Sequence, residues 1–260
     1  MKRFEGKAAI VTGAGSGIGR ATALLLASEG ASVLVSDIRS DSARETAKLI
    51  EREGGTSTVN ECDVADEAGV EAMTAQAVEA FGRLDVLVAN AGLLTMARIH
   101  QLSLADWQRV IDVHLTGTFL CCREALRHMI EHDGGSIVTI GSVSSVIVGV
   151  GPSAASYKAA KAGVLNLTKA VAVEYAHQGV RANCVCPGFV ETNIAKHMAE
   201  EASGWSLEGD DKPRRYELTI PIAKPAQPRD VAHAVAYLAS DDAAMVTGTS
   251  LMVDGGYTAV

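Results

Sequence analysis

The segment Thr12-Gly13-Ala14-Gly15-Ser16-Gly17-Ile18-Gly19 follows an apolar run at Ala8 to Val11 and opens an amphipathic stretch that ends near Gly30. Glycines here let a chain turn sharply between a strand and a helix, and they bring backbone N–H groups against a pyrophosphate. A glycine-rich run alone is a weak signal, since ordinary strand-to-helix turns also use glycine. Its position after a strand at the start of the chain favours dinucleotide binding through Gly13, Ser16, Gly17, Ile18 and Gly19.

Apolar strand-like runs alternate with helical stretches along the whole chain. Gly30 is expected to end the first helix, Ser40 or Asp41 to begin the second, Ser103 to cap a long fourth helix and Pro228 to open the last. Repeated strand-helix-strand units predict one α/β domain over residues 1–260, a doubly wound Rossmann-type fold with a parallel seven-stranded sheet and helices on both faces. Its ligand is expected at the carboxyl ends of the strands. The expected strands are Ala8–Val11, Ser32–Ser36, Ser57–Cys62, Leu84–Ala89, Ser136–Ile140, Val180–Cys186 and Ser250–Val253.

The composition narrows the class of protein. The 260 residues are 48% apolar but only 4% aromatic, so the core is expected to consist of Ala, Val, Leu and Ile with closely packed Gly. The net charge of -8 argues against nucleic acid or an anionic membrane surface as the main partner. No apolar run approaches a membrane span, and a strand pattern begins within a few residues of Met1, leaving no room for a signal peptide. These features indicate a cytoplasmic protein.

The five cysteines do not form the pattern of a disulfide framework. Cys184 and Cys186 would point to one face of an expected strand, and we interpret them as small core hydrophobes rather than metal ligands. The string His128-Met129-Ile130-Glu131-His132 matches a His-x-x-Glu-His zinc-peptidase pattern. It lies at an expected helix end without a third ligand nearby, so no metal site is predicted.

The segment from about Asn193 to Lys224 loses the strand and helix rhythm and becomes polar. A long excursion inside an α/β domain is either a lid over a site or a disordered loop. We favour a substrate lid over residues 193–224, because the segment follows the sixth strand, where the crevice is expected.

Asp37 ends the second expected strand, 18 residues after Gly19. A carboxylate at this position accepts hydrogen bonds from the adenosine ribose hydroxyls and would repel a 2′-phosphate, so NAD is the expected cofactor. Ser16 adds no basic side chain to the glycine turn, although the neighbouring Arg39 leaves NADP as an alternative.

Tyr157 and Lys161 lie four residues apart in an expected helix, so their side chains project from one face. A lysine held there favours the phenolate, lowering a phenol pKa that is ~10 when free, and can also hold a ribose hydroxyl. A tyrosine tuned in this way can exchange protons with an alcohol near neutral pH. The pair therefore indicates an enzyme, although the same spacing occurs on many solvated helices.

Taken together, these residues resemble the short-chain dehydrogenase/reductase family over essentially the whole chain. The resemblance implies that Tyr157 is the acid/base, that Lys161 anchors the ribose and tunes the tyrosine, and that Thr192 binds the carboxamide. It also implies a homotetramer, and it adds Val190 to the cofactor contacts. The matching motifs are the glycines Gly13, Gly17 and Gly19, the adenine-contacting Asp63-Val64, and Asn90-Ala91-Gly92, Pro187-Gly188 and Val253-Asp254-Gly255-Gly256.

The family also places a serine after the fifth strand, where it hydrogen-bonds the substrate oxygen. Reading Ile137 to Gly141 as the strand puts Ser142 at its tip, whereas Ser144 lies 13 residues before Tyr157, the spacing usual in the family. We select Ser142, because a strand end fixes a side chain more rigidly than a loop does, and Ser144 remains the alternative.

His114 is the main departure from the family pattern, which usually has asparagine at this position. That asparagine helps to hold a water that links the lysine to solvent. A neutral imidazole has one donor and one acceptor and could replace it, but titration near pH 6.5 would alter the relay. A packed histidine without a catalytic role is the alternative.

The sequence therefore predicts an NAD-dependent oxidoreductase that interconverts a secondary alcohol and a ketone. Leu93, Leu94, residues 146–151 and the lid are expected to line an apolar pocket for a small neutral substrate. One alternative is a 3-oxoacyl thioester reductase of the same family, against which Asp37 and the acidic balance count. The other is a nucleotide-sensing protein without turnover.

Overall fold

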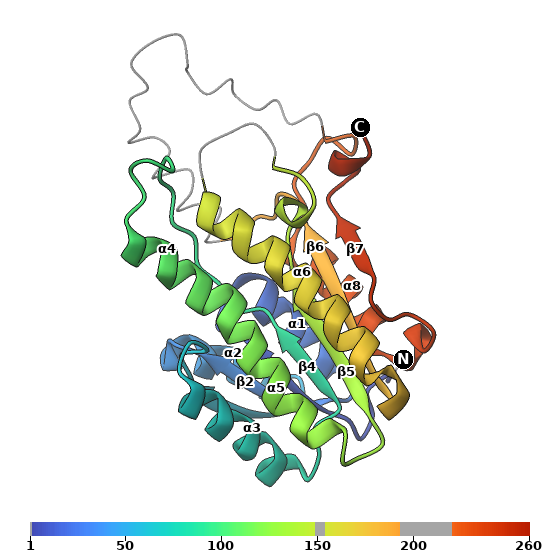
Figure 1. The fold of residues 1–260 in the computed structure, drawn as a ribbon. Coiled ribbons are helices and arrows are strands. Elements are labelled where there is room, and N and C mark those ends of the chain that lie inside the picture. The colour runs from blue at the N-terminus through green and yellow to red at the C-terminus, as the bar shows by residue number, and fades with distance from the viewer. Residues whose placement is uncertain (1, 149–153, 193–219) are drawn as a thin grey trace.

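The computed structural model describes residues 2–148, 154–192 and 220–260, and its centre is a parallel β-sheet (Figure 1). The seven strands run in the order β3-β2-β1-β4-β5-β6-β7, so the strand order reverses direction between β1 and β4. The prediction of seven parallel strands is confirmed, with boundaries that differ by one or two residues. The strands are β1 (Ala8–Thr12), β2 (Ser32–Asp37), β3 (Thr56–Glu61), β4 (Val86–Ala89), β5 (Gly135–Ile140), β6 (Val180–Pro187) and β7 (Ser250–Val253).

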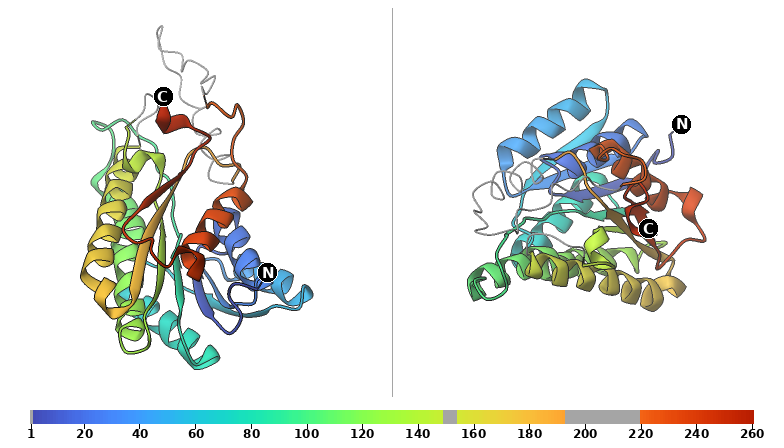
Figure 2. Two further views of the ribbon diagram at one scale, coloured as in Figure 1. Left: turned by 90° about the vertical axis from the view of Figure 1, so that its right-hand side faces the viewer. Right: turned by 90° about the horizontal axis from the view of Figure 1, so that it is seen from above.

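Helices cover both faces of the sheet, as Figure 2 shows from the side and from above. One apolar cluster packs α1, α2 and α8 against one face, and a second packs α3, α5 and α6 against the other. Strand-helix-strand connections are usually right-handed, so the helices lie on one face of the sheet where the chain moves from β1 to β3 and on the other face where it moves from β4 to β6. The helices are α1 (Gly17–Ser28), α2 (Ser40–Arg52), α3 (Glu67–Phe81), α4 (Leu104–Ile111), α5 (Gly117–Met129), α6 (Ala155–Tyr175) and α8 (Pro228–Ala239).

Two of the predicted helix starts, at Ser103 and Pro228, are confirmed. The Ser103 hydroxyl accepts a hydrogen bond from the Asp106 N–H at the start of α4, and Pro228 is the first residue of α8. The predicted long fourth helix is more complex, because a π-helical turn at Asp112–Thr116 joins α4 to α5. Such turns widen a helix locally and often occur at functional sites.

Among the described residues, no helix is long and apolar enough to cross a bilayer. The predicted lid lies mostly outside the described residues, since only 220–224 of it belong to them. Ile220 is buried, and it would contact any side chain added at Gly255.

Candidate active site

The glycine turn at the carboxyl end of β1 is held by the chain segment that follows β4. The Asn90 amide donates to the backbone oxygens of Thr12, at 2.8 Å, and Gly13, at 3.2 Å. The Thr12 hydroxyl in turn accepts hydrogen bonds from the backbone N–H groups of Asn90 and Ala91. A Cβ atom at Gly19 would collide with the Gly13 carbonyl, so only glycine permits this closure. Gly13, Gly19, Asn90 and Ala91 are therefore brought together as predicted.

The start of α1 fits a pyrophosphate. Ser16 is the N-cap residue, yet its side chain does not cap the first turn, which leaves backbone donors directed outward. Gly13 and Gly17 adopt left-handed φ angles of 62° and 53°, and Gly15 is buried, so no side chain obstructs the turn. This cradle suits the phosphates of a nicotinamide dinucleotide.

Arg20 was not predicted, although it supports this turn. Its guanidinium donates to the Gly15 carbonyl at 2.6 Å, to the Thr46 hydroxyl and to Glu45. The arginine therefore ties the glycine turn to α2. The feature of the sequence that could have identified Arg20 is its position directly after Gly19.

Asp37 lies at the end of β2 and is almost fully buried. One carboxylate oxygen accepts from the Gly15 N–H and the other from the Arg39 N–H, both at 2.9 Å. The Arg39 guanidinium approaches this carboxylate to 4.0 Å and remains largely exposed. Asp37, which the sequence predicts as a cofactor residue, is therefore a carboxylate that hydrogen bonds hold against the glycine turn.

The other predicted cofactor residues lie along the same edge. Asp63 is exposed after β3, whereas Val64 is buried and packs against Gly117. Gly188 follows β6, where a side chain would collide with Asp254. Pro187 ends β6, Val190 forms a bridge with Ala226, and the Thr192 methyl group would contact any side chain added at Gly17.

Tyr157 and Lys161 occupy the first half of α6, with the Lys161 ammonium 5.6 Å from the centre of the Tyr157 ring. Lys161 is buried and donates to the Ile140 carbonyl at 2.5 Å. Burial lowers the pKa of Lys161 to about 8, because a charged ammonium loses its hydration there.

The pKa of Tyr157 is raised above its usual value by burial, and a hydrogen bond with the Ser142 side chain opposes this shift. The prediction that Lys161 lowers the phenol pKa is therefore wrong for the protein chain by itself. Burial is the largest cause of the raised pKa, and the Lys161 ammonium is engaged by the Ile140 carbonyl.

Ser142 lies two residues after the end of β5, and its side chain interacts with the Tyr157 phenol. The Ser142 oxygen also accepts from the Ser144 N–H at 3.1 Å. Ser145, which was not predicted, connects this turn to α6, because its hydroxyl accepts from the Ser142 N–H and donates to the Lys161 carbonyl.

His114 lies in the π-helical turn and is buried. Its Nε2 atom is 2.6 Å from the Leu93 carbonyl oxygen, and its ring meets the Tyr157 ring edge to face with centroids 5.2 Å apart. The Nδ1 atom is buried without a hydrogen-bond partner among the described residues. Burial, and then the positive charge of Lys161, lower the pKa of His114 to about 3. The expectation that this ring titrates near pH 6.5 is therefore wrong.

Part of the predicted pocket wall can be placed. Leu93 and Leu94 are half buried in the segment after Gly92, and Val146 and Val148 are exposed after the serine turn. Residues 149–151 of the predicted wall lie outside the described residues.

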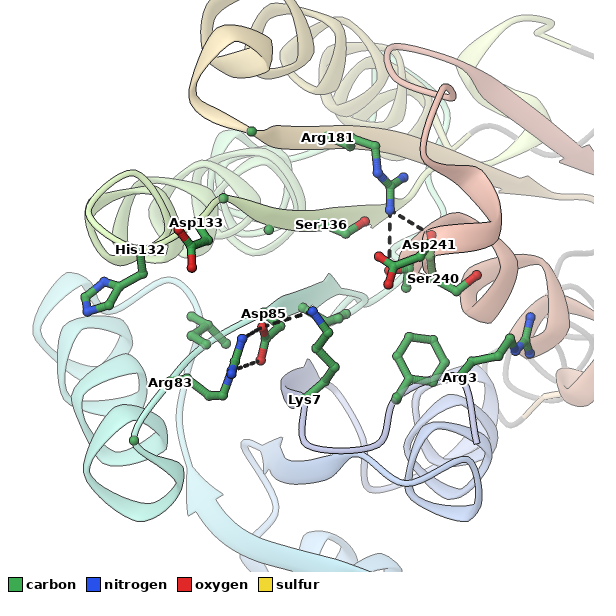
Figure 3. Close-up of a pocket in the computed structure, with 18 residues that line it drawn as sticks. Arg3, Lys7, Arg83, Asp85, His132, Asp133, Ser136, Arg181, Ser240 and Asp241 are labelled. Atoms are coloured by element: carbon green, nitrogen blue, oxygen red, sulfur yellow. Dashed lines mark hydrogen bonds and ion pairs between the residues drawn. The ribbon is translucent and has the colours of Figure 1, made fainter. Parts of the chain in front are cut away.

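A cavity of about 340 Å³ lies at the opposite edge of the sheet, near the amino ends of the strands (Figure 3). Several of its charged side chains already have partners. Arg83 donates two hydrogen bonds to Asp85, Lys7 is 3.7 Å from the same carboxylate, and Arg181 donates to the Leu238 and Ser240 carbonyls. This cavity is remote from the predicted catalytic residues, which gather where the strands end.

The rejected zinc-peptidase string has a local packing role. The rings of His128 and His132 stack with centroids 4.2 Å apart, and His132 Nδ1 is 2.9 Å from the His128 carbonyl. Within the described part of the chain, no group of three or more His, Cys, Asp or Glu side chains is arranged to hold a metal ion.

Comparison with known proteins identifies the family. A family model described as enoyl-(acyl carrier protein) reductase matches residues 13–258. A cis-4-hydroxycyclohexanecarboxylate dehydrogenase of Sinomonas cyclohexanicum is 44% identical, with 99% of this chain and 98% of that protein covered. A cyclohexanol dehydrogenase of Acinetobacter sp. (strain SE19) is 40% identical, with 98% and 96% covered. The solved structure of a short-chain type dehydrogenase/reductase from Mycobacterium marinum is 34% identical, with a TM-score of 0.91 over 99% and 97% of the two chains.

The chain belongs to the short-chain dehydrogenase/reductase family. It is an oxidoreductase that uses a nicotinamide cofactor and acts on CH–OH groups, interconverting a secondary alcohol and a ketone. The prediction of this class from the sequence is confirmed.

Proposed function

We propose that Tyr157 is the acid/base of an NAD-dependent secondary alcohol dehydrogenase. The observation that carries the proposal is the convergence of Tyr157, Ser142, Lys161 and His114 beside the glycine turn. The Ser142 side chain interacts with the phenol and lowers its pKa, and the His114 ring contacts the phenol ring. An alcohol oxygen held between the Ser142 and Tyr157 hydroxyls would lose its proton to Tyr157.

Lys161 can accept and release a proton in the pH range in which the enzyme is expected to work. With a pKa of about 8, it can be cationic near neutral pH and still release a proton as the pH rises. When bound, the oxidised nicotinamide accepts the hydride, and its positive charge favours the phenolate form of Tyr157. We assign the role of steadying the substrate oxygen to Ser142 rather than Ser144, and the support is the interaction of the Ser142 side chain with the phenol, which lowers the pKa of Tyr157 against the effect of burial.

The NAD preference rests on Asp37, whose buried carboxylate faces the glycine turn. A 2′-phosphate placed next to this charge would be repelled, and like-charge contacts cost several kcal/mol. Asp37→Asn keeps an acceptor for the Gly15 N–H and removes the charge. We expect the ratio of NAD to NADP affinity to fall by ~10² in this variant, measured by titration of both cofactors. A wild type that already prefers NADP would contradict the proposal.

The substrate we propose is a small neutral secondary alcohol or its ketone. The apolar side chains of Leu93 and Leu94, in the segment after Gly92, and of Val146, after the serine turn, support this class. Relatives whose names specify cyclohexanol and hydroxycyclohexanecarboxylate point further to a ring-bearing alcohol. A screen of cyclic and linear alcohols and polyols with NAD, followed by absorbance of the reduced nicotinamide, tests the class.

A matched pair makes the screen more informative. Cyclohexanol and its 4-carboxylate differ by one fixed negative charge. We expect the neutral alcohol to have the larger kcat/KM, and a strong preference for the carboxylate would contradict the proposed neutral pocket.

The thioester alternative receives some support from the matching family model, whose description concerns an acyl carrier protein. An acidic carrier protein needs a basic docking surface, whereas this chain has a net charge of -8. Reduction of an acetoacetyl thioester with NADH and NADPH in the same screen decides between the two activities.

We also propose that the enzyme works in the cytoplasm as a homotetramer. The described structure contains five free, buried cysteines, which suits a reducing compartment. The tetramer rests on the family resemblance, and light scattering in solution tests it.

A further inference from the structure

Cys184 and Cys186 lie directly behind the candidate active site, and the proposed reaction does not use them. Both side chains project from the same face of β6, as residues two apart in a strand must. Their sulfur atoms are 3.7 Å apart, and both residues are fully buried. The space for the two thiols comes from Gly141, because a Cβ atom there would approach both sulfurs to less than 3 Å.

The two thiols interact with the groups that position the proposed catalytic residues. The pKa of Cys186 is affected by the Ser142 backbone and the Ser145 side chain, and the pKa of Cys184 is affected by the Thr139 side chain and by the charge of Lys161. A change at the Cys186 sulfur would therefore reach Ser142, both through its backbone and through Ser145.

The electrostatic setting makes Cys184 the more reactive thiol. The hydrogen bond with Cys186, the hydrogen bond with Thr139 and the charge of Lys161 lower the pKa of Cys184 to about 7, against the opposing effect of burial. The pKa of Cys186 is raised instead. The two sulfurs, 3.7 Å apart on one face of β6, are within reach of a bond, and the lowered pKa of Cys184 favours the thiolate that would begin it.

We propose that Cys184 and Cys186 form an oxidisable dithiol that closes to a disulfide with hydrogen peroxide and thereby lowers turnover. The Cys184 thiolate attacks one peroxide oxygen, the O–O bond breaks, and a proton completes one water, leaving a sulfenic acid. The Cys186 sulfur then forms the S–S bond and releases the second water with the thiol proton. Two thiols and one peroxide give one disulfide and two waters.

The expected consequence follows from strand geometry. Residues two apart in a strand have Cα atoms about 6.6 Å apart, close to the upper end of the usual disulfide range. A bond there draws Cys186 away from Ser145, and the Ser142 turn loses that support. Such a strained bond is also easily reduced. We therefore expect kcat to fall and dithiothreitol to restore it, while cofactor affinity changes little.

The experiment treats the full-length protein with hydrogen peroxide and follows turnover and peptide mass together. Trypsin releases residues 182–196 as one peptide that contains Cys184 and Cys186 and no other cysteine. The expected result is the loss of two hydrogens from this peptide, parallel to a fall in kcat of about tenfold (~1.4 kcal/mol). Cys184→Ala should resist peroxide, and Cys184→Ser replaces it if the alanine variant does not fold.

Cys121 and Cys122 provide the matched control, because both are fully buried and burial raises the pKa of each. Cys122→Ala should remain as sensitive to peroxide as the wild type. A peptide 182–196 that keeps both hydrogens, or equal inactivation of the wild type and Cys184→Ala, overturns the proposal. The effect on turnover rests on the proposed role of Ser142, whereas the mass change does not. A protein inactive before oxidation would contradict only the proposed function.

Discussion

The two halves of the candidate active site are built by different means. Around the glycine turn, the contacts are made mostly by backbone atoms, and Asn90 and Arg20 hold that backbone in place. Around α6, the contacts are made by buried side chains whose ionisation depends on their surroundings, as the lowered pKa values of Lys161 and His114 show.

This difference determines how each half should respond to substitution. A backbone cradle fails when a side chain fills it, and the failure should affect cofactor binding. A group of buried side chains fails when one functional atom is removed, and the failure should affect kcat. The three predictions below test this division, from the largest expected effect to the smallest.

Tyr157→Phe should nearly abolish turnover while cofactor affinity stays close to that of the wild type. The substitution removes one hydroxyl that acts on the substrate, and general acid/base groups contribute ~10² to 10⁴ in rate. Steady-state kinetics and a cofactor titration measure the two effects separately. Tyr175→Phe, at the other end of α6, is the control and should behave as wild type. More than about a tenth of the wild-type kcat/KM in Tyr157→Phe, a loss below ~1.4 kcal/mol, would sink the assignment.

Gly19→Ala should weaken cofactor binding by about tenfold or more, or ~1.4 kcal/mol, because the new methyl group collides with the Gly13 carbonyl and the Asn90 amide. Overpacking of this kind also costs about 1–3 kcal/mol of stability. Gly69→Ala is the control. Gly69 is likewise the third residue of its helix, but the nearest atom to an added Cβ is the Asp66 carboxylate oxygen at 3.0 Å, the end of a flexible side chain. Equal effects of the two substitutions on cofactor titration and thermal melting would contradict the cradle.

His114→Asn and His114→Leu test whether the imidazole only fills space. The amide of asparagine can still donate to the Leu93 carbonyl, so this variant should keep most of kcat. Leucine cannot donate, and we expect a loss of about tenfold, or ~1.4 kcal/mol. Equal rates for all three proteins would show that the ring is only a packing element.

The acid stability of the same variants gives a second readout. Because the pKa of His114 is lowered from 6.5 to about 3 in the folded protein, the unfolded chain binds more protons between these values. The wild type should therefore lose stability as the pH falls from 6.5 towards 3, and His114→Leu should lose less over that range. Denaturant melts across this range measure the difference, with substitution of the exposed His177 as the control. An acidic limb of the wild-type rate profile that vanishes in His114→Asn would contradict the low pKa.

The fold and the position of the site could be predicted from local patterns. Strand-helix alternation repeats at short range, and Gly13, Gly17 and Gly19 are required by the backbone conformation itself. Asp37 and Thr192 follow expected strands, so their placement at one edge followed from the parallel sheet. His114, which the family resemblance linked to the proton path of Lys161, lies beside Tyr157 in the structure.

The ionisation of the site could not be predicted in this way. The sequence places Lys161 one helical turn from Tyr157, but only the tertiary structure directs its ammonium to the Ile140 carbonyl and buries it. The same holds for Ser145 and for the contact between Cys184 and Cys186, which depend on how β5, β6 and α6 pack together. Spacing along the chain determines which side chains share a face. The pKa values depend on burial and on partners that are distant in sequence, and these exist only in the folded protein.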